Sequence, residues 1–376
     1  MERYLKTAVV EDLKEKMVFL GGPRQVGKTT LALSLLKNGS EEHPAYLNWD
    51  DSATRKALLQ GTLPSGEELV VLDEIHKYKK WRNLVKGFYD LNKSRRHFLV
   101  TGSAKLDHYR RGGDSLQGRY HYHRLHPLSL HELGGSPTAR DVDHLLQFGG
   151  FPEPFFKGNA RHWKRWQRER QSRVIQEDLI NLEHVKEVSQ LDLLASVLPD
   201  RVGSPLSINN LRGDLSVAFE TADRWVTILE NLYFCFRIPP YGLPRFRAAR
   251  KEQKLYMWDW SLCLDEAARF ENLVASNLLK YCHFIEDGEG DRMELKFVRD
   301  SQGRELDFVV LRNGAPAFAV ECKTGEREVS RNIAYFSERT KIPQFFQVHL
   351  GQKDVETARF RARVLPLTAF ARWLNV

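Results

Sequence analysis

Short continuous apolar runs, each followed by polar or glycine-rich residues, dominate the first part of the chain. They are Met17 to Leu20, a second run that ends in "YLNWDD", "ELVVLDEIH" (Glu68 to His76) and Arg96 to Thr101. Apolar runs without alternation are typical of parallel strands that are buried on both faces. Gly27 to Leu36, after the first run, has the residues of a helix. The pattern predicts an α/β fold with a parallel sheet in residues 1–150.

The first apolar run leads directly into "GGPRQVGKTT". From Gly22 to Thr29 this stretch fits the GxxxxGK[ST] pattern, in the required order of strand, loop and helix. In such a loop, backbone N–H groups surround an anion, Lys28 reaches the β- and γ-phosphates, and Thr29 supplies a hydroxyl to Mg²⁺. The sequence therefore predicts an ATP site. Its expected contacts are Gly22, Pro23, Arg24, Gln25, Val26, Gly27, Lys28, Thr29 and Thr30.

Two carboxylates, Asp73 and Glu74, follow the apolar residues of the third run. At the carboxyl end of a parallel strand they would lie beside the phosphate loop. Asp73 would hold Mg²⁺ through water, and Glu74 would orient and deprotonate the attacking water. The alternative is an acidic strand end that caps the next helix. Ser103, after the fourth run, would either sense the γ-phosphate or cap a helix.

The middle of the chain, residues 151–260, has a different pattern. The run "RHWKRWQRERQSR", Arg161 to Arg173, holds six Lys or Arg against one Glu, and Trp163 and Trp166 share a helical face. This composition suits nucleic-acid binding, but also an amphipathic helix whose basic side is solvated. Three further helices, Leu191 to Leu198 and two opened by Ser207 and Thr221, precede the strand "YFCFRIPPY" and then "RFRAARKEQK". That order favours a winged helix, which serves either DNA reading or subunit contact.

Alternating apolar residues return in "LDFVVLRNGAPAFAVECK", Leu306 to Lys323, around an Asn-Gly turn signal. They predict a β-hairpin with Asp307 near the start of its first strand, and with Glu321 and Lys323 at the end of its second. Alternation places Glu321 and Lys323 on the same side of their strand. A salt-bridged structural hairpin is the alternative, but it would not need two acids and a lysine at one end.

Composition adds few constraints. The 376 residues carry a net charge of +8 and a pI near 9.2, which permits a nucleic-acid partner without requiring one. No apolar run is long enough to span a bilayer and no signal-peptide pattern is present, so we expect a cytoplasmic protein without a membrane partner. His121, His123 and His126 suggest zinc only weakly, because no carboxylate or cysteine completes a ligand set. The cysteines have no CxxC spacing and indicate reduced core residues: Cys235, Cys263, Cys282 and Cys322.

The order of phosphate loop, carboxylate strand and Thr-Gly-Ser strand resembles the AAA+ superfamily. The runs "LDEIHKYKKWRNLVKGFYD", "LVTGSAKL", "LQGRYHYHRLHPLSLHEL" and "GGFPEPFF" resemble a prokaryotic group of AAA+-like ATPases that carry a C-terminal domain long labelled as of unknown function. The resemblance implies that Arg119 is an arginine finger, delivered within a subunit or by its neighbour in a homo-oligomer. Arg110 and Arg111 are reserves, and a solvated surface arginine is the alternative.

From "DEAARFENLVASNLLKYC" onward, the expected order of helix, three strands, helix and strand resembles the PD-(D/E)xK nuclease fold. Asp307, thirteen intervening residues and then Glu321-x-Lys323 match its motif. The resemblance implies that Glu271, Asp307 and Glu321 chelate Mg²⁺ or Mn²⁺. It also implies that Lys323 positions the attacking water or stabilises phosphate charge.

These patterns predict three parts: an AAA+-like P-loop ATPase core in residues 1–150, a winged-helix connector in 151–260 and a PD-(D/E)xK nuclease-like domain in 261–376. The expected function couples ATP hydrolysis to metal-dependent cleavage of nucleic acid, with DNA favoured. One alternative is an ATP-dependent switch whose nuclease-like domain binds DNA or a protein without cutting. The other is a signalling ATPase with no nucleic-acid partner.

Overall fold

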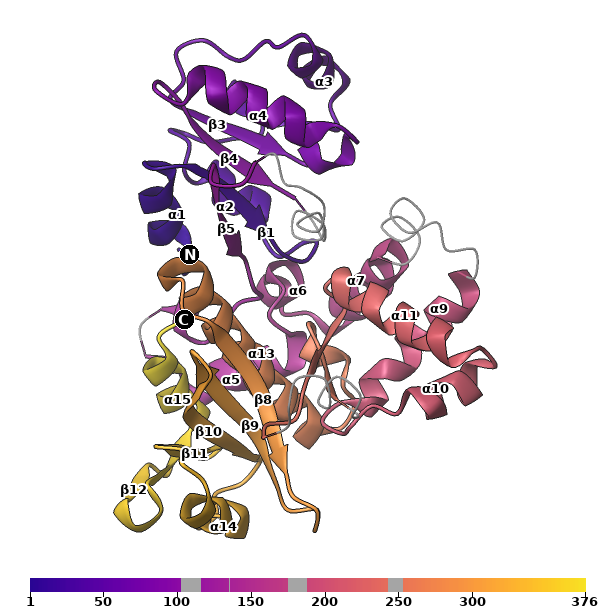
Figure 1. Cartoon of the computed structure of the whole chain (residues 1–376), viewed down its shortest axis with the longest axis vertical. Helices are drawn as coiled ribbons and strands as arrows, with labels where there is room; N and C mark the ends of the chain where they lie inside the picture. The colour runs from indigo at the N-terminus through magenta and orange to yellow at the C-terminus, as the bar shows by residue number, and fades with distance from the viewer. Residues whose placement is uncertain (103–115, 135, 175–187, 243–252) are drawn as a thin grey trace. The chain divides into compact units, whose positions relative to one another are not determined.

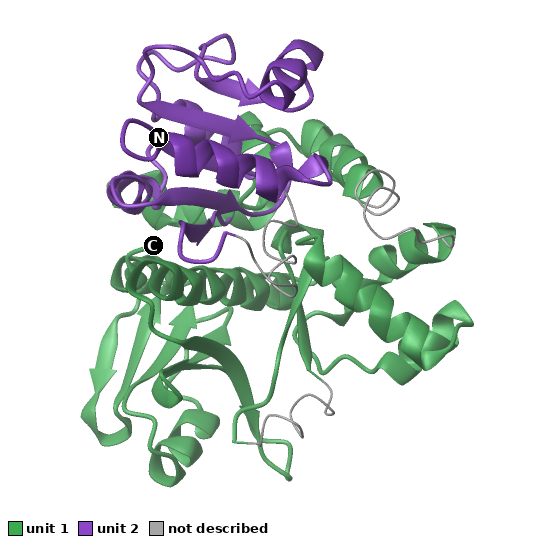
Figure 2. Ribbon diagram, turned by 45° about the horizontal axis from the view of Figure 1, so that its top comes forward, with its two compact units in different colours: residues 1, 127–376 green, residues 2–126 purple. Residues whose placement is uncertain are grey.

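The computed structural model describes residues 1–102, 116–134, 136–174, 188–242 and 253–376. They form two compact units, one of residues 2–126 and one of residue 1 with residues 127–376 (Figure 2). The first unit has a five-stranded sheet, and the second has a six-stranded and a two-stranded sheet. The division into three parts that the sequence suggests stays a prediction.

The unit of residues 2–126 is built on a parallel sheet with the strand order β2-β3-β4-β1-β5 (Figure 1). Four strands arise from the expected apolar runs, and β5 from the histidine-rich run. The strands are β1 (Met17–Gly21), β2 (Tyr46–Asn48), β3 (Leu69–Asp73), β4 (His97–Thr101) and β5 (Tyr120–Arg124). The helices are α1 (Lys6–Leu13), α2 (Lys28–Leu33), α3 (Ser52–Leu59) and α4 (Trp81–Asn92).

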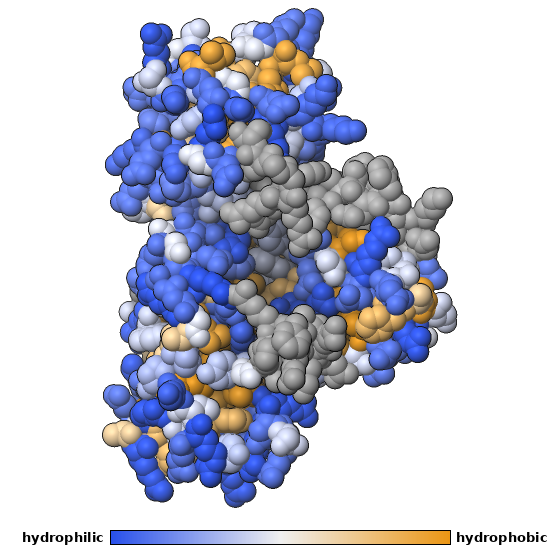
Figure 3. Space-filling view, in the orientation of Figure 1, coloured by the Kyte–Doolittle hydropathy of each residue, from blue (hydrophilic) through white to orange (hydrophobic). Residues whose placement is uncertain are grey.

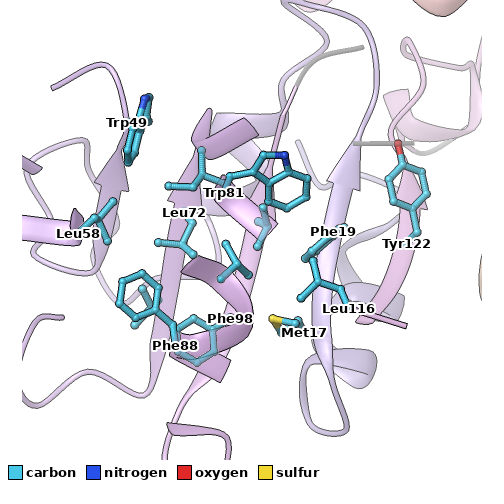
Figure 4. Packing of buried hydrophobic residues seen from close by; sticks show 14 residues of the cluster. Met17, Phe19, Trp49, Leu58, Leu72, Trp81, Phe88, Phe98, Leu116 and Tyr122 are labelled. Atoms are coloured by element: carbon cyan, nitrogen blue, oxygen red, sulfur yellow. The ribbon is translucent and has the colours of Figure 1, made fainter. Parts of the chain in front are cut away.

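The main core of this unit lies between the sheet and α4 (Figure 4). Along α4, Trp81, Val85 and Phe88 are buried, at the spacing that places residues on one face of a helix. Phe19 of β1 lies 5.7 Å from Trp81 and stacks on Tyr120 at 4.3 Å, measured between ring centroids. Burial of each such side chain contributes about 1.5–3 kcal/mol, and so fixes the strand ends that carry the polar residues.

The unit of residues 127–376 contains a sheet with the strand order β12-β13-β11-β10-β9-β8. Its strands are β8 (Met293–Arg299), β9 (Glu305–Arg312), β10 (Ala315–Lys323), β11 (Phe345–His349), β12 (Val355–Thr357) and β13 (Ala362–Pro366). Its helices are α13 (Glu266–Glu289), α14 (Arg331–Arg339) and α15 (Leu367–Leu374). The predicted hairpin is confirmed: β9 and β10 pair antiparallel, and Asn313 and Gly314 both have positive φ, as a tight hairpin turn requires.

Helices also form the earlier part of this unit. They are α5 (Ala139–Phe148), α6 (Pro152–Lys157), α7 (Ala160–Arg173), α9 (Val188–Val197), α10 (Ile208–Leu215) and α11 (Phe219–Asn231). An antiparallel pair follows, β6 (Cys235–Ile238) with β7 (Lys254–Met257). The side chain of Ser207 caps α10 as expected, but α11 begins at Phe219, before Thr221. The winged-helix assignment stays a prediction, and most of "RFRAARKEQK" lies outside the described residues.

Hydrophilic residues cover most of the face shown in Figure 3, with a few scattered apolar patches. Among the residues that the structure describes, none of the helices is both long enough and apolar enough to cross a membrane.

Candidate functional site

The phosphate loop connects β1 to α2 at the carboxyl end of the parallel sheet. Three of its residues, Gly22, Gln25 and Gly27, have positive φ angles of 142°, 62° and 98°. Left-handed residues in a turn let neighbouring N–H groups converge on one point, which makes an anion-binding concavity. A Cβ atom at Gly22 would lie 2.4 Å from the carbonyl oxygen of Leu125, so this position requires glycine.

The side chain of Lys28 is buried inside the loop. Its Nζ donates hydrogen bonds to the carbonyl oxygens of Gly22 at 3.0 Å and Pro23 at 2.7 Å. These bonds hold the ammonium group against the loop backbone, within reach of a phosphate that the loop would bind.

Arg3 supports the same loop from the start of the chain. Its guanidinium donates to the carbonyl oxygens of Val26 at 2.7 Å and His126 at 2.5 Å, and its side chain is buried. Sequence reasoning missed this residue, because no local pattern indicates that Arg3 contacts a loop more than twenty residues away. Because the planar guanidinium of Arg3 binds both carbonyl oxygens at once, it fixes the loop relative to the end of β5.

Asp73 ends β3 and is buried among hydroxyl groups. Its Oδ2 accepts hydrogen bonds from Thr29 Oγ1 at 2.9 Å and Tyr46 Oη at 2.6 Å, and its Oδ1 accepts one from Thr101 Oγ1. Burial and the neighbouring Asp73 carboxylate raise the pKa of Tyr46 above its usual range. Tyr46 and Thr101 were not predicted from the sequence; their only signal is that each lies on a strand beside β3.

Thr29 and Asp73, the two residues expected to hold Mg²⁺ beside ATP, are therefore brought together. A hydroxyl and a carboxylate are hard oxygen ligands, which Mg²⁺ prefers. The carboxylate of Asp73 has no ion pair among the described residues, so its charge is not neutralised by the protein. The donor set fits a Mg²⁺ ion bound together with nucleotide phosphates.

Glu74, the predicted base, follows Asp73 in a left-handed conformation with φ of 56°. Its N–H donates to the carbonyl of Thr101, and its carboxylate lies 3.5 Å from Lys77 Nζ and 3.8 Å from His76 Nε2. The buried Oε2 has no hydrogen-bond partner among the described residues. Burial lowers the pKa of His76, which favours its neutral form. A left-handed backbone and a buried carboxylate oxygen that has ion pairs but no hydrogen bond are features that concentrate at functional sites.

Arg119 lies at the opposite end of the sheet from the phosphate loop. Its carbonyl accepts from the N–H of Met17, the first residue of β1, while the loop follows the last residue. At about 3.3 Å per residue, the strand separates the two by roughly 15 Å. The Arg119 guanidinium pairs with Asp90 at 2.8 Å and is one-third exposed. A role for Arg119 as an arginine finger, in its own subunit or in a neighbouring one, stays a prediction. Ser103, Arg110 and Arg111 lie outside the described residues.

At the end of the hairpin, the structure brings Asp307, Glu321 and Lys323 together. The backbone N–H of Cys322 donates to Asp307 Oδ2 at 2.8 Å. Glu321 Oε1 pairs with Lys323 Nζ at 2.7 Å, and Glu321 Oε2 accepts from Ser330 Oγ at 2.5 Å. Burial raises the pKa of Glu321, although Lys323 opposes the shift.

A second lysine, which sequence reasoning did not assign to this cluster, lies among the remaining carboxylates. Lys254 Nζ is 2.5 Å from Glu305, 3.1 Å from Glu271 and 3.7 Å from Asp307, and its side chain is 1% exposed. Burial alone would lower the pKa of Lys254, but these carboxylates raise it above its ordinary value. Burial and the charge of Asp307 raise the pKa of Glu271 to about 7.

The predicted metal ligands Glu271, Asp307 and Glu321 do not fit a divalent ion in this arrangement. Such an ion needs several carboxylate oxygens on one side of a shared space. Here the ammonium of Lys254 lies beside Glu271 and Asp307, while protein groups bind both oxygens of Glu321. Across the part of the chain that the structure describes, no group of three or more His, Cys, Asp or Glu residues could hold a metal ion.

The other charged motifs have structural partners. His123 pairs with Asp12 at 2.7 Å, and the metal finding above leaves the zinc hypothesis without support among the described residues. In α7, Trp166 is buried, and Trp163 donates to Ser261 Oγ at 3.0 Å. Trp166 is thus packed inside the unit and Trp163 is half-buried, whereas the exposed side of α7 is mainly basic.

Three family models match the chain in succession. Residues 14–134 match a model described as an AAA domain. Residues 139–271 and 267–370 match two models that are each described as a domain of unknown function, DUF8612 and DUF4143.

Curated relatives match at low identity. The uncharacterized protein Rv2008c of Mycobacterium tuberculosis is 24% identical over 331 residues, which cover 81% of this chain and 72% of the relative. The uncharacterized protein MJ1637 of Methanocaldococcus jannaschii is 22% identical over 299 residues, which cover 65% of this chain and 61% of the relative.

Solved structures show only partial likeness. The Aeropyrum pernix ORC1 protein in complex with DNA has a TM-score of 0.35 at 13% identity, covering 74% of this chain and 94% of that one. The Thermotoga maritima RuvB Holliday junction branch migration motor has a TM-score of 0.30 at 19% identity, covering 62% and 87%. TM-scores this low carry no functional conclusion. The matched AAA model, the phosphate loop and the parallel sheet together show that the N-terminal unit has an α/β P-loop NTPase fold of the AAA type.

Proposed function

We propose that this protein binds and hydrolyses ATP with Mg²⁺, and that the nucleotide state switches its activity towards a partner. The observation that carries the proposal is the Thr29–Asp73 contact of 2.9 Å beside the phosphate loop. In this assignment Lys28 neutralises the β- and γ-phosphates, and Thr29 and Asp73 hold the ion. Glu74 takes a proton from the attacking water, so that ADP and inorganic phosphate are released.

Two variants separate binding from hydrolysis. Lys28→Ala should weaken binding of a fluorescent ATP analogue, because it removes charge neutralisation at the phosphates. Glu74→Gln should keep binding and lower phosphate release by roughly 10²-fold or more, because it removes only the base. Glu42→Gln, at an exposed position away from the loop, is the matched control. Parental phosphate release by Glu74→Gln would overturn the assignment of the base.

We propose nucleic acid, with DNA favoured, as the partner. The exposed side of α7 supports this: Arg161, Lys164, Arg165 and Arg168 recur at helical spacing, and none has an ion pair among the described residues. Such a row of cations suits a phosphate backbone. The burial of Trp166 and the hydrogen bond of Trp163 to Ser261 favour backbone contact over base stacking.

Binding of labelled duplex DNA at several salt concentrations tests this partner. Replacing Lys164 and Arg168 by Glu should weaken binding at least tenfold, and should reduce the slope of log K against log salt by roughly 0.9 for each phosphate that the protein no longer neutralises. Replacing the exposed Arg331 and Lys341 by Glu changes the net charge equally and is the control. Equal effects in both variants would indicate a general charge effect instead of a site on α7.

Metal-dependent cleavage is the second candidate function. The convergence of Asp307, Glu321 and Lys323 at one end of the hairpin favours it, and the ion pairs of Lys254 oppose it. The geometry therefore supports a switch that binds its partner without cutting. Incubation of the protein with single-stranded, duplex and branched DNA, and with RNA, in Mg²⁺ or Mn²⁺ decides between them. Cleavage that Asp307→Ala abolishes would establish the nuclease.

A further inference from the structure

The cluster around Lys254 joins three elements of the C-terminal unit. Lys254 begins β7, Glu271 belongs to α13, and Glu305 and Asp307 belong to β9. A buried ammonium is unfavourable unless carboxylates and hydrogen bonds compensate it. Three carboxylates within 4 Å of Nζ provide that compensation, and the three protons of the ammonium match their number.

The backbone of Lys254 is fixed on two sides. It pairs with Ile238 of β6, and it forms a bridge with Pro205. The Nζ atom also lies 5.7 Å from the ring centre of Phe297. The backbone that carries the ammonium is therefore held beside the carboxylates.

Charges in the cluster are nearly balanced without any added ion. Glu305 has a second partner, Arg299, at 3.8 Å, and Glu321 is paired with Lys323. Four carboxylates thus face three cationic side chains: Glu271, Glu305, Asp307 and Glu321 against Lys254, Arg299 and Lys323. The hydroxyl of Tyr256 donates to Glu271 at 2.7 Å and stabilises a carboxylate whose ion pair within the cluster is with Lys254 alone.

We propose that the ammonium of Lys254 is the resident cation of this cluster and takes the place of a divalent ion. The carboxylates then hold β7, α13 and β9 together in a metal-independent way. Removal of the ammonium would leave Glu271, Glu305 and Asp307 facing one another, and repulsion among them would be relieved by Mg²⁺ or Mn²⁺. This inference goes beyond the proposed ATP chemistry and does not depend on it.

Binding of Mn²⁺ to the full chain without nucleotide tests the proposal, measured by calorimetric titration and by the shift in melting temperature. The parent should bind no Mn²⁺ in the micromolar range and should melt at the same temperature in Mn²⁺ as in chelator. Lys254→Met keeps an unbranched side chain of nearly the same length but removes its charge. This variant should gain at least tenfold in Mn²⁺ affinity and should melt higher in Mn²⁺ than in chelator.

Two further variants make the test specific. Lys296→Met removes a lysine that pairs only with Glu294 among the described residues, and should behave as the parent does. Lys254→Arg keeps a cation in place and should also show no metal response. If Lys254→Met does not fold, the parent and Lys254→Arg still decide the question. Micromolar Mn²⁺ binding by the parent that Asp307→Asn abolishes would overturn the proposal, as would a folded Lys254→Met that binds no metal.

ATP hydrolysis measured on the same proteins separates this inference from the proposed function. Lys254→Met and Lys254→Arg should hydrolyse ATP at the parental rate. Loss of hydrolysis in Glu74→Gln together with Mn²⁺ binding by the parent would refute only the resident cation. Hydrolysis at the parental rate by Glu74→Gln, together with no Mn²⁺ binding by the parent, would refute only the ATPase assignment.

Discussion

The two acidic sites of this protein differ in what surrounds their carboxylates. Asp73 accepts hydrogen bonds from three neutral hydroxyls, those of Thr29, Tyr46 and Thr101. Hydroxyls orient a carboxylate but leave its charge uncompensated, so a cation can still be bound. Asp307 and its neighbours instead surround the ammonium of Lys254, which supplies the cation from within the chain.

This difference shows that a set of acids does not define a metal site. Both sites were expected to hold Mg²⁺, and both have carboxylates at strand ends. The nature of the other partners decides the outcome: neutral donors leave room for a divalent ion, whereas a buried lysine takes its place.

The strongest test removes the uncompensated charge at the first site. Asp73→Asn keeps the size of the side chain but cannot attract Mg²⁺, so phosphate release should fall by roughly 10²–10³-fold. The measurement is phosphate release as a function of Mg²⁺ concentration. Asp143→Asn, at an exposed position, is the matched control. An unchanged rate would mean that the hydroxyls around Asp73 hold a purely structural carboxylate.

The cluster around Lys254 should make the stability of the protein depend on pH through Glu271. The pKa of Glu271 is raised to about 7, mainly by burial and then by Asp307. Because the folded state favours the protonated form of Glu271, protonation of this group stabilises the fold. The contribution to the free energy of unfolding is complete below the unfolded pKa of about 4.5 and is lost as pH rises through 7. The loss amounts to at most roughly 3 kcal/mol.

Glu271→Gln removes this titration. Relative to the parent, the variant should gain free energy of unfolding as pH rises from 4.5 to 7.5, measured by urea denaturation. Glu266→Gln, exposed in the first turn of the same helix, should follow the parent at every pH. If the free energy of unfolding of Glu271→Gln and of the parent changed in parallel with pH, the cluster would not shift the pKa of Glu271.

Arg119 tests whether the first site is completed by a neighbouring subunit. Arg119→Ala should lower the turnover rate about tenfold or more with little change in nucleotide affinity, because an arginine finger acts on the transition state. Mixing it with Lys28→Ala protein should restore part of the activity. Asp90→Asn breaks the same ion pair but keeps the arginine, and serves as the control. Turnover that is independent of protein concentration down to the monomer would contradict delivery between subunits.

The smallest expected effect concerns a single hydroxyl at the first site. Tyr46→Phe removes one of the donors to Asp73 and should cost about 1 kcal/mol of stability, with a change of a few-fold in KM for Mg-ATP. Thermal unfolding and steady-state kinetics measure the two quantities. Tyr335→Phe removes a hydroxyl without a hydrogen bond among the described residues and should change neither. An effect as large as that of Asp73→Asn would mean that Tyr46 contributes to the chemistry itself.

Local patterns of the sequence determined the phosphate loop, the carboxylate strand and the hairpin. Each depends on neighbouring residues: "GPRQVGKT" has glycine at two of its three positions with positive φ, and Asn313-Gly314 lies between two alternating runs. Four of the five parallel strands were also visible as continuous apolar runs, because strands buried on both faces need apolar residues throughout. The ends of these local patterns also place Thr29, Asp73, Asp307 and Glu321 at the ends of strands or loops.

The fold brings together distant residues that no local pattern of the sequence assigns to these sites. Arg3 contacts the phosphate loop, Tyr46 and Thr101 hold Asp73, and Lys254 lies among acids from α13 and β9. A lysine in a basic run gives no local sign of burial. Its ammonium is stable in the interior only because the fold brings carboxylates to it from other elements, and no pattern of neighbouring residues encodes that encounter.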